Sequence, residues 1–458
     1  MLSTIERGSI KNIGVLIFGR KRPGFDQEWN KIIRERVLST LKSLGFNCIG
    51  ADRLVLDDET IHAAMDEIEG AKCNALIVIQ PSLTDGQFAL TISQRWSDPV
   101  ILWATPERPG DGKVSSCSLV GQHLWASIYR QAHRPFEFVY GDPDEIHDDL
   151  LRAISLVSTV SRLRRSKIGV IGTHAPGFID LAADPFLVRQ TFGMQLHSLS
   201  LPQFIERVSN ITGDSVGEDL NQVHKLGLPQ GETRKAPPDA LLSVNSRFYL
   251  SMTDLIKELS LNALSLQCWP ELPNMVGQWP YFAVSRLTAE GNAVSIEGDV
   301  DGAISSLMGG LLGVGPGFLT DWLEHDDSTI FFWHPGMAPL DMCNAIGSEN
   351  GPTLGEHFNI PRPLVVDGLL QGDQPITVSR LWRCDNRYHM TAFEGRAIPP
   401  KRRVSGNSLL VEVGGEPVPP RFDRLIHAGM PHHVLLHFGS HSETFRRLAR
   451  LLRIDWHS

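Results

Sequence analysis

The sequence lacks an apolar run of the roughly 18 residues or more that a membrane-spanning helix needs. Its first residues, MLSTIERGSIKN, also lack the apolar segment of a secretory signal. Cysteine is scarce: the 458 residues include six, widely scattered and without a CxxC pair. These features predict reduced thiols in a cytoplasmic protein that has no membrane partner.

An excess of basic residues is also missing. Lys and Arg total 43 against 52 Asp and Glu, so the formal net charge is −9. This balance argues against a protein that binds nucleic acid without regard to sequence, because such a protein needs a basic surface. The composition is otherwise ordinary for a globular protein, and the length predicts two or three domains.

Several familiar catalytic and binding motifs are absent. The sequence has no HExxH, no Cys/His cage for structural zinc and no GxSxG elbow. A glycine-rich stretch does occur, but it closes a predicted helix and lacks the Lys-Ser/Thr ending of a phosphate-binding loop. Turn formation and close helix–sheet packing are the better interpretation of its glycines, which are Gly309, Gly310, Gly313, Gly315 and Gly317.

The pattern of apolar runs predicts the fold class. Continuous apolar runs at 13–18, 75–79 and 100–104, with a helical pattern at 28–44, are typical of an α/β domain with a parallel sheet covered on both faces. We expect this first domain to span residues 1–165.

A second α/β series is predicted over residues 166–335. Its strands are expected at 167–172, 263–267, 293–296 and 317–320, and its helices at 240–260, 281–290 and 301–312. From residue 336 to 458 the pattern changes to short alternating segments, such as 375–382, 388–393 and 408–413. These predict a C-terminal β-rich, barrel-like domain, which ends in a helix at 442–452.

Two acids occupy matching positions in consecutive units: Glu297 follows one predicted strand and Asp321 follows the next. The helix between them, with Asp299 and Asp301 suited to its N-terminal end, reads as a right-handed crossover joining parallel strands. Neighbouring parallel strands would bring both acids to one sheet edge, with the strands about 5 Å apart. The alternative interpretation is that these acids are helix caps or solvated loop residues.

Two carboxylates held that close repel each other unless a cation lies between them. A divalent metal is the simplest solution; oxygen ligands favour Mg²⁺ or Mn²⁺, and an added histidine favours Mn²⁺ or Co²⁺. Histidine candidates are His334, after the run TIFFW, and a C-terminal group of five: His427, His432, His433, His437 and His441. Of the adjacent pair His432 and His433, strand alternation lets only one face a given site.

The strand before Glu297 also ends in polar and aromatic residues. Gln267, Trp269 and Glu271 follow it in the segment LQCWPELPN. An indole face and an amide suit a sugar, so Gln267 and Trp269 are substrate-binding candidates; core and turn roles are the alternative.

The motifs IEGDVDGAISSLMGGLLGVGPGFLTDW, CWPE, HPGMAP and MPHHVLLHFGSH together resemble the L-fucose isomerase and L-arabinose isomerase superfamily. The resemblance covers the second and third predicted domains well, and in the first it depends on architecture and on SLVGQHLWASIY. It implies an aldose–ketose isomerase with two α/β domains and a β-rich domain. It further implies Mn²⁺, or Mg²⁺ or Co²⁺, and a homo-oligomer, a hexamer, with active sites between subunits.

Carried over by motif, Glu297 and Asp321 match the acid pair that serves as metal ligands and as acid and base. His433, or its neighbour His432, matches the C-terminal histidine ligand, and His334 matches a histidine that arabinose-type enzymes place near the metal. The chain departs from both subgroups: Thr320 stands where the arabinose type has an acid, and the fucose type has no counterpart of His334.

In this family a neighbour's first domain closes the active site. Arg20, Gln122 and His123 are the candidates for that role. The cluster Arg20, Lys21 and Arg22 is either a solvated loop or a pocket group that favours a sugar bearing a carboxylate or sulfonate.

The residues suit the chemistry, because moving a carbonyl between C1 and C2 requires a proton acceptor, a proton donor and a Lewis acid. Two other functions remain as alternatives: a non-catalytic sugar-binding or regulatory protein on the same scaffold, and a metal-dependent hydrolase or aldolase.

Overall fold

The computed structural model describes residues 11–20, 25–110, 112–231 and 235–458. The chain separates into two compact units. Unit 1 runs to Arg164 and includes Arg450–Arg453, and unit 2 comprises Arg165–Ala449 and Ile454–Ser458. Among the described residues, no helix combines the length and the apolar character that a membrane span requires. All six cysteines lie in the described part of the chain, and all are free thiols.

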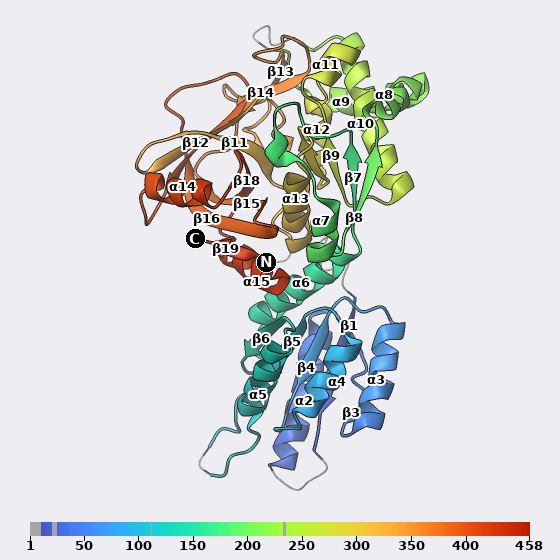
Figure 1. The fold of residues 1–458 in the computed structure, drawn as a ribbon, viewed down its shortest axis with the longest axis vertical. Helices are drawn as coiled ribbons and strands as arrows, with labels where there is room; N and C mark the ends of the chain where they lie inside the picture. Colours follow the sequence, from blue (N-terminus) through green and yellow to red (C-terminus); the bar gives the residue numbers. More distant parts are fainter. Residues whose placement is uncertain (1–10, 21–24, 111, 232–234) are drawn as a thin grey trace. The chain divides into compact units, whose positions relative to one another are not determined.

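Unit 1 contains the predicted parallel sheet (Figure 1). Its strands follow the order β2-β1-β4-β5-β6, with β3 also beside β1, and every pairing is parallel. The strands are β1 Asn12–Phe18, β2 Asn47–Ile49, β3 Leu54–Val55, β4 Leu76–Ile79, β5 Val100–Ala104 and β6 Phe136–Tyr140. The helices are α2 Gln27–Ser43, α3 Asp58–Gly70, α4 Gln87–Arg95, α5 Ser118–Gln131 and α6 His147–Arg164. The central strands β4 and β5 are wholly buried, as continuous apolar runs predict.

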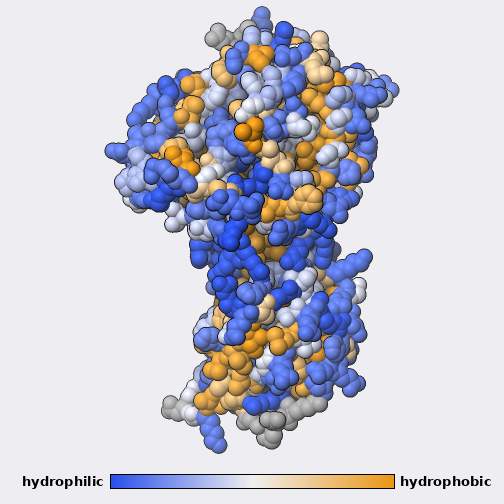
Figure 2. Space-filling model, viewed as in Figure 1, coloured by the Kyte–Doolittle hydropathy of each residue, from blue (hydrophilic) through white to orange (hydrophobic). Residues whose placement is uncertain are grey.

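One face of α5 in unit 1 is apolar and exposed. Leu119, Val120 and Leu124 are 43%, 58% and 43% exposed. In Figure 2 apolar residues gather over the part of unit 1 where Figure 1 draws α5. Apolar groups gathered on a surface in this way are typical of an interaction face.

Unit 2 contains a four-stranded parallel sheet with the order β10-β9-β7-β8. Its strands are β7 Lys167–Ile171, β8 Gln195–Leu199, β9 Ala263–Leu266 and β10 Ala293–Ile296. The associated helices are η1 Ile179–Leu181, α7 Pro185–Phe192, α8 Leu201–Asn210, α9 Gly213–Leu226, α10 Asp239–Leu259, α11 Glu271–Val276, α12 Tyr281–Ala289 and α13 Val300–Leu312.

Unit 2 also contains a nine-stranded sheet. Six of its strands follow one another in the order β17-β12-β11-β18-β15-β16, and β16 pairs with β17, which closes them into a barrel. The pairings around this ring are antiparallel. The strands are β11 Phe318–His325, β12 Thr329–His334, β13 Thr353–Gly355, β14 Val365–Leu369, β15 Pro375–Cys384, β16 Arg387–Ile398, β17 Asn407–Val413, β18 His433–Phe438 and β19 Asp455–His457. The helices are η2 Leu340–Met342, α14 Val418–His427 and α15 Ser442–Leu452. The predicted fold class, two parallel α/β regions followed by a barrel-containing β region, is confirmed.

The predicted crossover between two parallel strands is wrong. β10 lies at the edge of the parallel sheet, whereas β11 pairs antiparallel with β12 and β18 in the barrel. The start of β11 is buried on both faces, and a short apolar run cannot distinguish a parallel strand from a barrel strand buried in this way. β11 and β12, placed before residue 335 by the domain prediction, therefore pair in the C-terminal sheet.

Helix α13 explains how two sheets meet at one place. It contacts β9 and β10 of the parallel sheet as well as β15 and β18 of the barrel, and Figure 1 shows it between them. Its residues are buried almost all round, which matches its apolar composition. The helix that was expected to return the chain to the same sheet instead carries it into the barrel.

Candidate active site and metal centre

Glu297 stands on a constrained turn directly after β10. Its φ is +60° and that of Gly298 is +73°, so two successive residues adopt the left-handed conformation. Gly298 is required there, because a Cβ would lie 2.2 Å from the Thr173 carbonyl oxygen. The amide of Ala175 donates to the Glu297 carbonyl at 2.8 Å. A non-glycine residue held at positive φ often marks a functional position, and the Glu297 residue is only 8% exposed.

Asp321 reaches the same place from the barrel. In β11 it lies opposite His433 of β18, and opposite residues of an antiparallel pair project from the same face. Its side chain is 24% exposed. The two acids therefore come from different sheets and not from adjacent parallel strands.

His433 lies at the point where the acids converge. Its Nε2 is 3.4 Å from a Glu297 carboxylate oxygen and 3.7 Å from Asp321 Oδ1. Its Nδ1 is 2.9 Å from Asp299 Oδ2, and both the His433 and Asp299 side chains are wholly buried. The structure thus brings together the three residues that the motif comparison had aligned with the acid pair and the C-terminal histidine.

Two atoms at this point lack hydrogen-bond partners among the residues that the structure describes. His433 Nε2 and Asp321 Oδ1 are both buried and unpaired, although buried polar atoms in native proteins are normally bonded. An imidazole nitrogen beside two carboxylates is a suitable donor set for a divalent cation. The residues therefore fit a metal ion.

Burial and neighbouring charges shift the pKa values of the site residues in opposite directions. Burial raises the pKa of Asp321 to about 6, with His433 opposing and Glu297 adding to this shift. Burial alone would also raise the pKa of Glu297, but the adjacent His433 imidazole outweighs it and lowers that pKa. Burial disfavours the charged form of His433, yet Asp299 and Glu297 outweigh it and raise its pKa to about 10. The acids thus favour a positive charge at the position of His433.

The second histidine of the pair also lies close. The ring centroids of His432 and His433 are 4.3 Å apart. Ligand atoms of Glu297, His432 and His433 all lie within 4.8 Å of one another. The expectation that only one of this pair faces the site is wrong, because β18 begins at His433 and strand alternation does not govern His432. His432 is the more exposed of the two, at 38% of its side chain.

His334 lies on the other strand beside Asp321, at a greater distance from His433 than His432 does. Its ring centroid is 6.0 Å from that of His433, and its buried Nδ1 has no hydrogen-bond partner in the described part of the chain. Burial lowers the pKa of His334 to about 3, which keeps the imidazole neutral, as a metal ligand must be.

Most of the remaining C-terminal histidines serve the fold. His437 bonds to the Gly315 carbonyl and the Ser379 hydroxyl, and His441 bonds to the Phe438 carbonyl. A Cβ at position 317 would lie 2.6 Å from the His437 ring, so the predicted role of that glycine in close packing fits. His427 is exposed at the end of α14.

An aromatic wall adjoins His432. Trp269 stacks on Phe178 with ring centroids 6.1 Å apart and an interplanar angle of 5°, and Phe178 meets His432 edge-on at 5.0 Å. Gln267 is less available than predicted, because its side-chain oxygen accepts from the Thr173 amide at 2.8 Å.

The sequence interpretation missed three groups beside these residues. Phe178 and Asp180 come from the segment after β7, with Asp180 inside the short helix η1, where no local motif marked them. Asp180 lies 3.7 Å from His432 Nδ1. Asp299 had been interpreted only as a helix terminus, although its place in the Glu-Gly-Asp motif was the available signal.

The three candidates from the first domain lie in unit 1. Gln122 is wholly buried, and its amide nitrogen donates to the carbonyls of Val78 and Trp103 at 2.7 and 3.2 Å. That amide group supports the sheet of unit 1. His123 is exposed on α5.

Arg20 is exposed and lines a cavity of about 390 Å³ together with Thr84, Asp85 and Phe88. Lys21 and Arg22 lie outside the described residues.

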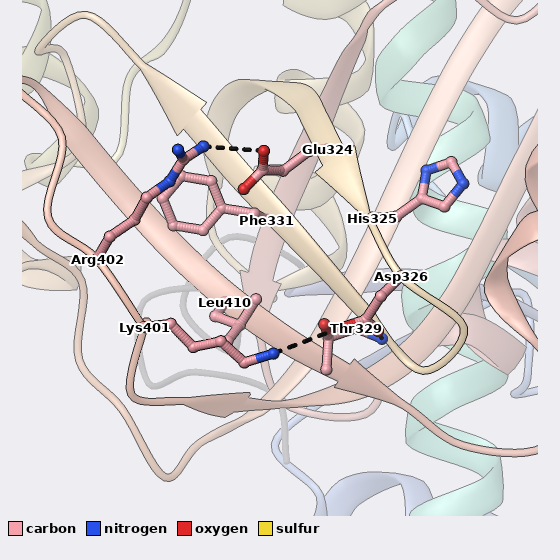
Figure 3. Close-up of a pocket in the computed structure, with 8 residues that line it drawn as sticks. All are labelled: Glu324, His325, Asp326, Thr329, Phe331, Lys401, Arg402 and Leu410. Atoms are coloured by element: carbon pink, nitrogen blue, oxygen red, sulfur yellow. Dashed lines mark hydrogen bonds and ion pairs between the residues drawn. The ribbon is translucent and has the colours of Figure 1, made fainter.

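A further cavity of about 480 Å³ lies on unit 2, beside the β11–β12 hairpin (Figure 3). Its charged groups are paired: Arg402 bonds to Glu324 at 2.8 Å, and Lys401 lies 3.7 Å from Asp326. Its lining contains none of the convergent acids or histidines described above. The candidate site is therefore the group around His433 and not this cavity.

Comparisons with known proteins agree with the motif resemblance. Residues 14–164 match the family model for the N-terminal domain of fucose/sulfoquinovose isomerase. Sulfoquinovose isomerases from Priestia aryabhattai and Priestia megaterium (strain ATCC 12872 / QMB1551) are each 28% identical over 454 residues, covering 97% of this chain and 99% of theirs. A sulfoquinovose isomerase from Clostridium sp. (strain MSTE9) is 26% identical, covering 94% of this chain and 96% of its own.

Among solved structures, an ABC transporter periplasmic solute-binding protein from Actinobacillus succinogenes 130z with bound D-allose aligns at 11% identity and a TM-score of 0.16. That alignment covers 66% of this chain and 91% of the other, and is too weak to support an argument. The family match and the full-length relatives carry the assignment. These comparisons support membership of the fucose isomerase-like superfamily and an isomerase that interconverts an aldose and a ketose.

Proposed function

We propose that the chain is a metal-dependent isomerase acting on a sulfonated hexose of the sulfoquinovose type, with Glu297 and Asp321 as its acid–base pair. The observation that carries the proposal is the convergence of these two acids on the unpaired Nε2 of His433. Glu297, Asp321 and His433 would hold the cation, with His432 and His334 as neighbouring donors. Their oxygen and nitrogen atoms suit Mn²⁺, or Mg²⁺ or Co²⁺.

The reaction requires one proton to leave a sugar carbon and another to reach the adjacent carbon. In this proposal one of the two carboxylates, Glu297 or Asp321, takes the first proton and the other returns one to the adjacent carbon. The bound cation supplies Lewis-acid stabilisation of the negative charge that develops on the sugar oxygens. The wall of Trp269 and Phe178 provides an apolar surface for the sugar ring and excludes water.

The substrate proposal depends on the relatives, which are named sulfoquinovose isomerases. A sulfonate needs a cationic partner, and Arg20 in its cavity of about 390 Å³ is the residue we assign to it. The superfamily places active sites between subunits, so we also propose a homo-oligomer in which a neighbour's unit 1 supplies Arg20 and His123. The exposed apolar face of α5 supports such an association.

A substrate and metal assay tests this function. The purified chain is treated with a chelator and assayed against sulfoquinovose, L-fucose and L-arabinose before and after Mn²⁺ is restored. We expect activity only with Mn²⁺ and the highest kcat/KM for the sulfonated sugar. Reaction in deuterated water should place deuterium on C1 or C2 of the recovered sugar. Full activity after exhaustive chelation would contradict the metal proposal, and neutral sugars outcompeting the sulfonated one would contradict the substrate proposal.

A further inference from the structure

Asp299, which contacts Nδ1 of His433, is held in place by several hydrogen bonds. Asp299 is wholly buried and uses both carboxylate oxygens. Its Oδ1 accepts from the Gly302 amide at 2.8 Å and from Arg380 at 3.0 Å. Its Oδ2 accepts from the other Arg380 nitrogen at 2.6 Å and lies 2.9 Å from His433 Nδ1. A carboxylate gripped on two sides in this way has little freedom to move.

These contacts determine the tautomer of His433. Arg380 donates to both carboxylate oxygens of Asp299 and the Gly302 amide donates to Oδ1, so the carboxylate acts as the acceptor in this cluster. The proton in the His433–Asp299 contact therefore resides on Nδ1. In the neutral imidazole, Nε2 then keeps its lone pair, and Nε2 is the atom nearest Glu297 and Asp321.

The same contacts also fix where the imidazole lies. Asp299 is the N-cap of α13, Arg380 belongs to β15 and His433 begins β18. At Gly302 a Cβ would lie 2.6 Å from Asp299 Oδ2, so the close approach of the carboxylate to the helix depends on that glycine. The carboxylate joins the helix shared by the two sheets to two strands of the barrel.

We propose that Asp299 and Arg380 form a positioning dyad, which orients His433 and presents its Nε2 as the ligand atom for the cation. This inference rests on the proposed metal dependence. Carboxylates that hold metal-binding imidazoles through their second nitrogen typically change metal affinity by 10- to 100-fold when they are replaced. Neither residue touches the substrate in this proposal; both act through His433.

A purely structural role is the competing explanation, and the chain contains a matched control. Asp301 is also buried at the start of α13, accepts from Arg383 at 2.7 Å and accepts from the Tyr388 hydroxyl at 2.9 Å. Among the described residues, these hydrogen-bond partners of its carboxylate do not include a histidine. If Asp299 served only to neutralise an arginine and complete a helix terminus, replacing either aspartate would have the same consequences.

The experiment compares Asp299→Asn with Asp301→Asn in the metal-free full-length chain. Isothermal titration with MnCl₂ measures affinity without any catalytic readout, and thermal unfolding measures stability. We expect both variants to lose stability. We expect only Asp299→Asn to weaken Mn²⁺ binding, by about 10- to 100-fold. Arg380→Lys, which keeps the charge but loses the two-pronged contact, should give a smaller loss and can be measured if Asp299→Asn does not fold.

The outcomes separate the two proposals. Tight Mn²⁺ binding by the wild type together with unchanged binding by Asp299→Asn, or by Arg380→Lys where only that variant folds, would overturn the dyad and leave the metal dependence standing. Equal weakening in Asp299→Asn and Asp301→Asn would also overturn it, because the effect would then follow general destabilisation. A wild-type chain that binds no Mn²⁺ would contradict the proposed function itself, and the dyad with it.

Discussion

Two acids, Glu107 after β5 in unit 1 and Asp321 within β11 in unit 2, have opposite surroundings. Glu107 accepts five hydrogen bonds from the segment Ser115–Cys117, whereas Asp321 Oδ1 accepts no hydrogen bond from any described residue. Partial burial raises the pKa of Glu107, but the serine hydrogen bonds outweigh it and lower that pKa to about 2. At Asp321 burial prevails and the pKa rises to about 6. Function is therefore expected where the fold leaves an acid unsatisfied.

The largest expected effect comes from exchanging one acid in each unit for its amide. Glu297→Gln removes a proton-transferring group and a proposed ligand, so kcat should fall by about 10²- to 10⁴-fold. Glu107→Gln should leave kcat close to that of the wild type, because its carboxylate serves a loop of unit 1. Initial rates measured at saturating Mn²⁺, with circular dichroism to verify folding, test both variants. If Glu297→Gln turned over substrate at the wild-type rate, the proposed role of Glu297 in proton transfer would be wrong.

Metal binding should affect stability through the unsatisfied acids. A ligand that binds only the folded state at about 100 times its dissociation constant adds about 2.7 kcal/mol to the free energy of unfolding. Mn²⁺ should therefore raise the midpoint of thermal unfolding of the wild type. The midpoint of Asp321→Asn should rise much less on adding Mn²⁺, and that of Glu107→Gln should rise as much as that of the wild type. An equal rise of the unfolding midpoint in all three proteins would show that Mn²⁺ binds at a site without Asp321.

A smaller effect is expected from Arg20, which links unit 1 to substrate choice in our proposal. Hydrogen bonds to charged groups typically contribute about 1.5–3 kcal/mol, so Arg20→Ala should lower kcat/KM for sulfoquinovose by roughly 10- to 150-fold. Turnover of a neutral aldose should change little, which makes that substrate the internal control. An equal loss for both sugars would show that Arg20 does not recognise the sulfonate.

The smallest effect concerns pH and again separates the two acids. Because the pKa of Glu107 is lowered from 4.5 to about 2 in the folded chain, its stabilising contribution is complete above pH 4.5 and is lost as the pH falls towards 2. Unfolding of Glu107→Gln should therefore differ most from that of the wild type near neutral pH, and the difference should shrink below pH 4.5. Denaturant titrations at pH 7, 5 and 3.5 measure it, and a difference that grows on acidification would contradict this account.

The sequence predicted the residues of the candidate site better than the route by which they meet. The apolar runs located β10, which ends before Glu297, and the first part of β11, which continues through Asp321 to His325, and the histidine-rich tail contained His433. The pairing of β11 with the barrel was not predictable, because a run buried on both faces looks the same in a parallel sheet and in a closed barrel. Asp299 was recognised as a helix cap, but its second role depends on Arg380 and His433, which lie 81 and 134 positions further along the chain.

The sharing of α13 by both sheets has a consequence for how substrate preference is changed in this scaffold. Glu297 follows a strand of the parallel sheet and Asp321 lies in a strand of the barrel, and α13 packs against both sheets. A backbone shift that moves one carboxylate is therefore expected to disturb the packing that holds the other. Variation in pocket size should therefore accumulate in segments such as the one carrying Phe178 and Asp180. Attempts to redirect the enzyme towards new sugars should begin with those segments and leave α13 intact.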